Sequence, residues 1–159
     1  MTSPGTNKQK GTSIDTAIGL YHTGGDYSAL LLPPDLQHIL DAYIADGEND
    51  VVMADSIQSP MKLRIGDNYY VGKIDQLRRS PRGLQVWDIK YSKKKPKELL
   101  EFYLPQLMLY AYAFECRIGG IVNVRNYLTT DPVHIVVNYP CPSSLEMHAL
   151  NLNMERQRR

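Results

Sequence analysis

Hydrophobic residues recur at helical spacing in two stretches of the first third of the chain. In residues 11–24 the apolar positions fall three and four apart, and Thr12 or Ser13 is a suitable N-cap. A second stretch, Asp35 to about Ala45, follows Pro34, which suits the first turn of a helix. Both stretches are therefore predicted to be helices, each with one apolar face.

The middle of the chain changes to short segments rich in β-branched and aromatic residues. Turn-forming residues separate the later segments, so we expect antiparallel strands joined by tight turns. The single tryptophan, Trp87, lies in one of them and is expected to fill the core. The predicted strands are Val51–Ile57, Met61–Ile65, Tyr69–Leu77 and Leu84–Tyr91.

Helical spacing returns from Glu98 to Arg117, where Pro105 is expected to kink or interrupt a long helix. The glycine pair at 119–120 is expected to close that helix. The remaining predicted elements are strands over residues 121–128 and 133–139 and a final helix capped by Ser143 or Ser144.

The order of these elements predicts an α/β fold with a mixed central sheet flanked by helices. The 159 residues suit one domain with a hydrophobic core. Residues 1–10 are polar and are expected to form a flexible leader, so residues 11–159 would make up a single domain.

Composition narrows the class of protein. A hydrophobic content of 43% and a charged content of 22% are typical of a soluble domain. No apolar run approaches the ~18 residues of a membrane span, so we expect a cytoplasmic protein without a membrane partner. Cys116 and Cys141 are too few for a four-thiolate iron–sulfur cluster, and we expect both to be structural thiols.

The formal net charge of +1 hides an uneven distribution of charge. Residues 73–97 contain nine basic and two acidic residues, a net charge of +7, and the rest of the chain therefore carries −6. A concentration of positive charge is what binding to a phosphate backbone requires. The alternative is that the lysine run at 93–95 is only a solvated loop.

The two acids in this basic stretch are Asp75 and Asp88, each near the end of a predicted strand. Side chains in a strand alternate with period two, so Asp88 and Lys90 project to the same side. Carboxylates plus a substrate phosphate can hold Mg²⁺ or Mn²⁺, and an ammonium beside the ion can act on the attacking water. This spacing predicts metal-dependent hydrolysis of a phosphodiester.

Three motifs occur in order: V-G-K-I-D, L-Q-V-W-D-I-K and Q-L-M-L-Y. This order resembles that of the PD-(D/E)xK nuclease superfamily, in particular its RecB-like and lambda-exonuclease-like branch. The resemblance covers Gly11 to about Val124. It implies a restriction-endonuclease-like core with the element order αβββαβ, DNA as the partner, and Mg²⁺ or Mn²⁺ as the cofactor.

The resemblance also implies roles for individual residues. Asp75 and Asp88 would bind the metal together with the backbone carbonyl of Ile89, and Lys90 would position or activate the attacking water. Gln106 and Tyr110, four apart on one helix face, would contact the site or the DNA backbone. The basic residues expected to hold the phosphate backbone are Arg78, Arg79, Lys93 and Lys94.

The first helix departs from the family pattern. Its G-T-S-I-D sequence resembles a G-T-x-x-H motif in which the histidine is a site residue, and Asp15 occupies the histidine position. Aspartate suits a hard cation, so Asp15 is either a further metal ligand or simply an acid that the helix dipole favours. His22, further along the same helix, could substitute for the missing histidine.

These inferences favour a DNA exonuclease of the recombination or repair type. An endonuclease or junction resolvase would use the same residues, and a nuclease fold that binds nucleic acid without cutting it is a third alternative. A homo-oligomer is possible because small nucleases often surround their substrate.

Overall fold

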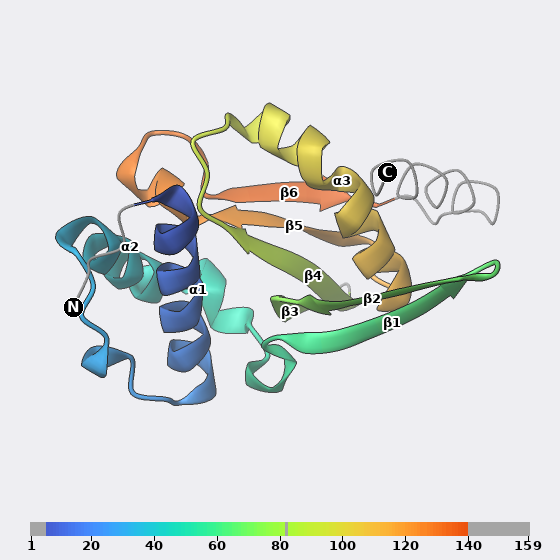
Figure 1. The fold of residues 1–159 in the computed structure, drawn as a ribbon, viewed down its shortest axis with the longest axis horizontal. Coiled ribbons are helices and arrows are strands. Elements are labelled where there is room, and N and C mark those ends of the chain that lie inside the picture. Colours follow the sequence, from blue (N-terminus) through green and yellow to red (C-terminus); the bar gives the residue numbers. More distant parts are fainter. Residues whose placement is uncertain (1–5, 82, 140–159) are drawn as a thin grey trace.

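A mixed sheet of four strands forms the centre of the structure, a computed structural model that describes residues 6–81 and 83–139 (Figure 1). The strands lie in the order β3–β4–β5–β6; β4 and β5 are parallel, and both outer pairs are antiparallel. This arrangement confirms the predicted α/β fold with a mixed sheet. The strands are β3 (Gln76–Ser80), β4 (Gly83–Lys90), β5 (Ile118–Asn123) and β6 (His134–Asn138).

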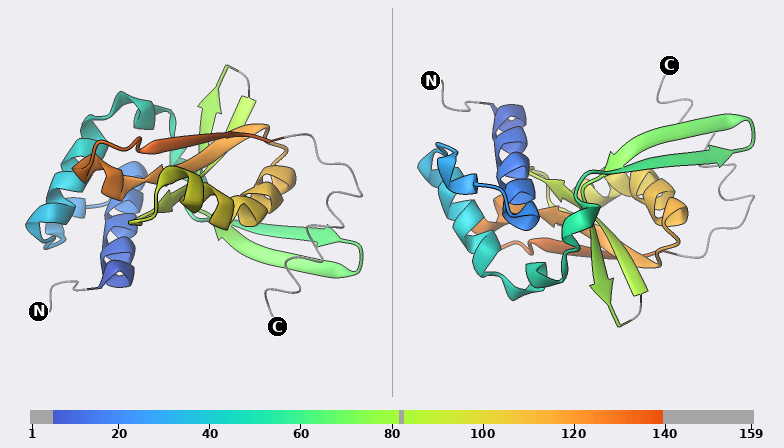
Figure 2. Two further views of the ribbon diagram at one scale, coloured as in Figure 1. Left: turned by 90° about the horizontal axis from the view of Figure 1, so that it is seen from above. Right: turned by 90° about the horizontal axis from the view of Figure 1, so that it is seen from below.

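Helices cover both faces of the sheet (Figures 1 and 2). On one face, α1 (Asn7–Thr23) and α2 (Pro34–Ala45) pack their apolar residues against Trp87 and Ile89 of β4. On the other face, α3 (Pro96–Ala113) packs against Val86 and its neighbours. The alternation of β4 therefore decides which of its side chains faces which helix, and Trp87 lies in the core as predicted.

The chain that was expected to form one strand over Tyr69–Leu77 is divided between two sheets. Its first part, β2 (Asn68–Ile74), pairs with β1 (Ser59–Ile65) in a separate antiparallel hairpin that extends away from the central sheet. Its second part is β3, which pairs with β4. The break falls at Asp75, where the chain bends from one sheet into the other.

The helix boundaries differ from the predicted ones at two ends. α1 begins at Asn7 instead of Gly11, because Thr6 and Gln9 form a capping box in which each side chain binds the backbone N–H of the other. α3 ends at Ala113 and continues through Pro105 without interruption. The predicted final helix and residues 1–5 of the leader lie outside the described residues.

Gly119 and Gly120 were expected to end the preceding helix, and that prediction was wrong. Both lie within β5, between β4 and β6. A Cβ atom on Gly119 would overlap the carbonyl oxygen of Val86, and one on Gly120 would overlap that of Ile135. The glycines therefore allow the central strands to approach closely, and residues 124–128, expected to continue the strand, form a 3₁₀ turn instead.

The strand predicted over Val51–Ile57 is also absent, and 3₁₀ turns occupy Gly47–Val51 and Ala54–Ser56. Only an isolated bridge between Val52 and Arg78 pairs this segment with the sheet. The Ser56 hydroxyl accepts a hydrogen bond from the Leu77 backbone N–H at 2.8 Å. Side-chain hydrogen bonding of this kind competes with a regular ladder.

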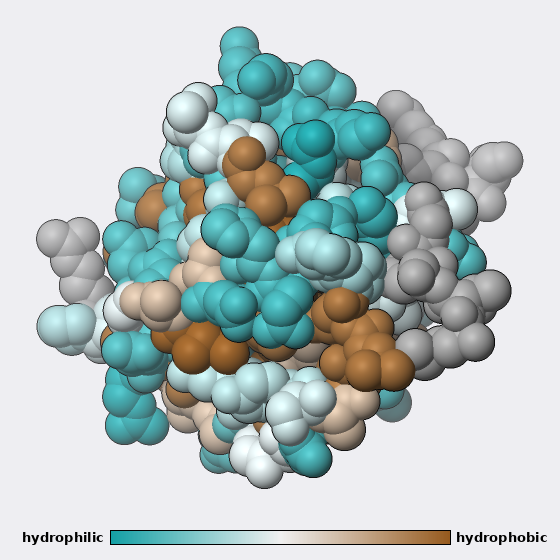
Figure 3. Space-filling view, turned by 90° about the vertical axis from the view of Figure 1, so that its left-hand side faces the viewer, coloured by the Kyte–Doolittle hydropathy of each residue, from teal (hydrophilic) through white to brown (hydrophobic). Residues whose placement is uncertain are grey.

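Hydrophilic residues cover most of the side of the molecule that carries α2, where hydrophobic residues form separate small patches (Figure 3). Within residues 6–81 and 83–139, no helix is long and apolar enough to cross a membrane.

Candidate active site

An open cavity of about 430 Å³ lies where β3 diverges from β4, with α1 and α3 contributing to its walls. Because β3 begins only at Gln76, opposite Trp87, the last residues of β4 have no strand beside them on that edge. The cavity brings together the following residues that the sequence predicted: Asp15, Asp75, Asp88, Ile89, Lys90, Gln106 and Tyr110.

Asp75 occupies the bend between the hairpin and the sheet. Its Oδ2 accepts a hydrogen bond of 2.7 Å from the backbone N–H of Ile89, and its Oδ1 accepts one of 2.9 Å from Gln58 Nε2. The Asp75 carboxylate therefore accepts the hydrogen bond that a backbone carbonyl of a neighbouring strand would otherwise accept from β4. This bond fixes Asp75 next to the residue that follows Asp88.

Asp88 is the least solvated carboxylate of the site, with only 6% of its surface exposed. Its Oδ2 is buried without a hydrogen-bond donor, although Lys90 Nζ lies 3.0 Å away as an ion pair. Burial raises the pKa of Asp88 well above its usual range, and the neighbouring Asp75 raises it further. Two close carboxylates with too little positive charge around them are a suitable environment for a cation.

These residues fit a divalent metal ion of the kind that PD-(D/E)xK-type motifs imply. Asp75 and Asp88 supply hard oxygen ligands, and the buried Oδ2 of Asp88 has only the Lys90 ammonium, at 3.0 Å, to balance its charge. Across the described part of the chain, no three Asp, Glu, His or Cys side chains form a metal-binding group. A bound ion would therefore complete its coordination with backbone oxygen, water or substrate, as Mg²⁺ commonly does.

Lys90 lies on the same side of β4 as Asp88, as its spacing predicted. Its Nζ sits 4.0 Å from the centre of the Tyr103 ring on α3, a cation–π contact that holds the half-buried side chain in place. Burial alone would lower the pKa of Lys90, but Asp88, Tyr103 and Asp75 together outweigh it and the pKa is raised. Lys90 is therefore a protonated ammonium at neutral pH.

Gln106 and Tyr110 lie on the face of α3 that looks into the cavity. Gln106 Nε2 donates a hydrogen bond of 2.7 Å to Tyr110 Oη, as the spacing of four residues allows. Gly72 on β2 lies beside this pair, since a Cβ there would be in van der Waals contact with Tyr110 Oη at 3.4 Å. The pair therefore forms the wall of the cavity next to the hairpin.

Asp15 reaches the cavity from α1, whereas His22 does not. Burial, followed by the negative charge of Asp75, raises the pKa of Asp15 to about 6. His22 Nε2 instead lies 2.6 Å from Tyr43 Oη, and burial, followed by the charge of Arg78, lowers its pKa to about 4. His22 is therefore part of the packing between α1 and α2 and does not replace a site histidine.

We expect Asp15→Asn to stabilise the protein at neutral pH. The folded-state pKa of about 6 lies above the ordinary value of 3.8, so ionisation of Asp15 opposes folding above pH 6 and has no such effect below about pH 4. The gain should be about 3 kcal/mol at pH 7 and should disappear towards pH 4. Urea unfolding in EDTA at both pH values would measure it.

The matched control for this prediction is Asp67→Asn in the exposed hairpin turn, which should change the stability at neither pH. Equal stability of Asp15→Asn and the unaltered protein at pH 7 would contradict the electrostatic account of Asp15.

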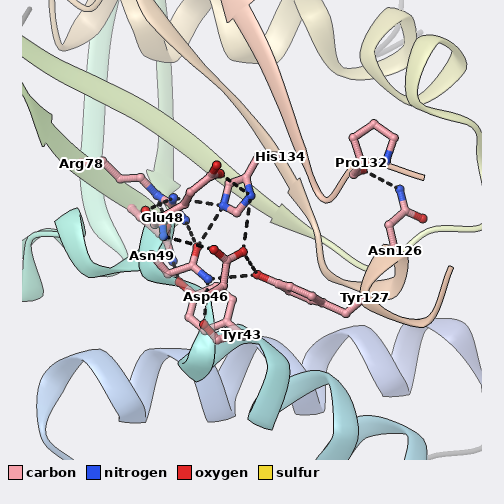
Figure 4. A network of polar contacts seen from close by, with 10 residues as sticks. Tyr43, Asp46, Glu48, Asn49, Arg78, Asn126, Tyr127, Pro132 and His134 are labelled. Atoms are coloured by element: carbon pink, nitrogen blue, oxygen red, sulfur yellow. Dashed lines mark hydrogen bonds and ion pairs between the residues drawn. The ribbon is translucent and has the colours of Figure 1, made fainter. Parts of the chain in front are cut away.

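Arg78 was expected to hold a phosphate, and the structure contradicts this prediction. Only 2% of Arg78 is exposed. Its guanidinium donates to the backbone oxygen of Glu48 at 3.0 Å and to Asn49 Oδ1 at 2.8 Å (Figure 4). The guanidinium also lies over the Trp87 ring. The network extends through His134, whose Nδ1 is 3.0 Å from Glu48 Oε2. Arg78 therefore joins the turn after α2 to the sheet and cannot reach DNA.

The other predicted basic residues are exposed but differ in position. Arg79 is opposite Leu84, at the end of β3 away from the cavity. Lys93 and Lys94 lie in the loop between β4 and α3, and Lys94 Nζ is 3.4 Å from Glu98 Oε1. The sequence analysis missed Lys73, which lines the cavity. Its place two residues before Asp75 was a usable signal, since alternate residues of a strand share a side.

Cys116 is buried, and burial raises the pKa of its thiol to about 11. This agrees with a structural role for that cysteine; Cys141 lies outside the described residues.

Comparison with known proteins gives a family for this chain. A sequence model described as "PD-(D/E)XK nuclease superfamily" matches residues 26–120. No curated protein matches the chain. Among solved structures, that of SSO0001 is similar over 76% of this chain and 55% of its own, with 21% sequence identity and a TM-score of 0.47. The chain thus spans little more than half the length of SSO0001.

Proposed function

Because the chain belongs to the PD-(D/E)XK nuclease superfamily, we propose that it is a deoxyribonuclease that requires Mg²⁺ or Mn²⁺ and hydrolyses phosphodiester bonds. One observation carries this proposal. Asp75, Asp88 and Lys90 line one open cavity, in which the buried Oδ2 of Asp88 lies 3.0 Å from Lys90 Nζ. Such an arrangement is costly for a protein that only binds nucleic acid, because Lys90 alone does not offset the burial of Asp88, whose pKa stays raised.

Each residue of the site has a part in this proposal. Asp75 and Asp88 hold the cation, and the carbonyl of Ile89 offers a further oxygen. When bound, the cation supplies positive charge that polarises the phosphate and lowers the pKa of water. Lys90, as an ammonium, orients the attacking water and offsets the charge that develops on the phosphate oxygens. Asp15, on the opposite wall, is a further possible ligand.

Residues around the cavity would position the substrate. Gln106 and Tyr110 form a polar wall beside the carboxylates, and Lys73 adds an exposed cation on the hairpin side. Lys93 and Lys94 extend the positive charge along the loop that follows β4. These residues would contact the DNA backbone, while Arg79 could do so only at a distance from the reacting phosphate.

Within the superfamily we propose an exonuclease of the recombination or repair type, related to the RecB-like and lambda-exonuclease-like branch. The Q-x-x-x-Y pair supports this assignment because both side chains line the cavity. Assembly into a homo-oligomer would help a domain of this size to enclose DNA.

The experiment that tests the proposal is cleavage of end-labelled linear and covalently closed circular DNA in the presence of Mg²⁺, Mn²⁺ or EDTA. Metal-dependent loss of linear DNA alone would support an exonuclease. Cutting of circles would instead indicate an endonuclease or resolvase with the same site. DNA binding without cleavage under every condition would contradict the proposed activity.

We expect Lys90→Met to lower the cleavage rate by about 10²-fold, because it removes the ammonium but keeps the apolar stem of the side chain. Single-turnover cleavage at saturating DNA would measure the rate. Lys97→Met, at an exposed position of α3, is the matched control and should cleave normally. A Lys90→Met variant as fast as the control would exclude Lys90 from the reaction.

A further inference from the structure

A second and larger hollow lies beside the candidate active site, between the β1–β2 hairpin and α3. Its volume is about 760 Å³. The hairpin crosses the second half of α3 in Figure 1 and lies beside α3 in Figure 2. Residues of both elements line the hollow. We call this hollow the hairpin groove. The residues that matter below are Val71 on the hairpin and Phe102, Tyr103, Gln106 and Tyr110 on α3.

Apolar and aromatic side chains that line the hairpin groove are exposed to solvent. Val71 is 75% exposed and Phe102 is 63% exposed, and both line the groove. Phe102 also packs edge-on against Tyr103, with ring centres 4.9 Å apart. Rings of this kind, held by a neighbour and open to solvent, offer surfaces on which flat groups can stack.

A cation accompanies the exposed Phe102 ring. Lys94 Nζ lies 5.2 Å from the centre of that ring. A ring with a cation beside it suits a ligand that combines a flat base with a phosphate. Glu101 also lines the groove, where its carboxylate can accept hydrogen bonds from exocyclic amino groups.

The hairpin groove continues into the candidate active site. Gln106 and Tyr110 line both cavities. Tyr103 lines the groove and also carries Lys90 over its ring at 4.0 Å. A chain lying in the groove would therefore lead directly to Asp75, Asp88 and Lys90.

We propose that the hairpin groove binds the unpaired bases of a single-stranded DNA segment and delivers its backbone to the active site. This proposal rests on the proposed nuclease function. Single-stranded DNA is the occupant that fits, because aromatic faces can stack only on bases that are free of the duplex. The substrate would accordingly be single-stranded DNA, or a duplex that carries a single-stranded end.

Binding in EDTA tests the groove separately from cleavage. Fluorescence anisotropy would compare one labelled strand, free and in a blunt duplex, for the unaltered protein, Phe102→Ala and Phe102→Trp. Loss of one stacked base should weaken binding of the free strand about 5- to 150-fold in Phe102→Ala. Phe102→Trp should retain binding, and the affinity for the blunt duplex should not change. Leu31→Ala, an exposed apolar residue outside the groove, is the matched control.

The outcomes separate the groove from the nuclease. The proposed role of the groove would be overturned if Phe102→Ala weakened the binding of free strand and duplex equally, or weakened neither. This holds even if the protein cleaves DNA. Phe102-dependent binding of the free strand in a protein that cleaves nothing would support the groove and refute the proposed activity. A change of mass in solution on Phe102→Ala would instead show that a second copy of the chain occupies the groove.

Discussion

Asp88→Asn is expected to abolish DNA cleavage while leaving the fold at least as stable as before. The substitution keeps the size of the side chain but removes a negative charge that a cation needs. Without the cation, the charge that develops on the phosphate is no longer stabilised, so the cleavage rate should fall by at least about 10³-fold. Because burial raises the pKa of Asp88, its ionised form opposes folding without a metal, so the neutral amide should not destabilise the protein in EDTA. Rates in Mg²⁺ and Mn²⁺, together with urea unfolding in EDTA, would measure both effects.

Asp67→Asn again serves as the control, because it makes the same chemical change at a fully exposed position. A direct measurement of Mn²⁺ binding would show whether the loss of activity comes from loss of the metal. Retention of cleavage by Asp88→Asn would remove Asp88 from the mechanism, and unfolding of the variant would mean that the carboxylate is structural.

Arg78→Met is expected to destabilise the protein by about 3–5 kcal/mol, a large part of the 5–15 kcal/mol that typical domains possess. The substitution removes the donor of the buried Gln76 side-chain oxygen and of the partly buried Glu48 carbonyl, and leaves Asn49 Oδ1 with His134 alone. Urea unfolding would measure the effect as a lower midpoint with an unchanged slope.

Arg79→Met is the matched control, since it removes the same charge from the exposed neighbouring position and should change stability by less than about 0.5 kcal/mol. Arg78→Lys should also be destabilised, because one ammonium cannot replace the fork of the guanidinium. A stable Arg78→Met variant with weakened DNA binding would revive the rejected role of Arg78 as a phosphate contact.

Which residues gather at the site could be predicted from the sequence better than how the fold brings them together. Asp88 and Lys90 share a side of β4 because strands alternate, and that rule needs no tertiary information. Asp75 was predicted to be a metal ligand but was placed inside a continuous strand. Its bend depends on the pairing of β2 with β1 and of β3 with β4, which no local pattern specifies.

The wrong predictions have the same cause: residues far away in the sequence decide the structure at these positions. Arg78 looked like any basic residue of an exposed strand, and its partners Glu48 and His134 lie 30 and 56 residues away. Gly119 and Gly120 looked like a helix end, whereas the carbonyl groups that require glycine belong to β4 and β6. In each case the deciding neighbour comes from another part of the chain.

The bend at Asp75 also separates two requirements that a nuclease must meet: a carboxylate in a fixed position and a surface that can extend along the substrate. On the side of β3, Gln76 Nε2 donates to Tyr43 Oη of α2 at 2.8 Å, and the backbone N–H of Ile89 donates to the Asp75 carboxylate. The sheet and α2 therefore fix the position of that carboxylate. On the side of β2 the chain enters a hairpin that pairs with no strand of the central sheet. The length of that hairpin can therefore change, and with it the reach of the protein along a substrate, without moving the carboxylate.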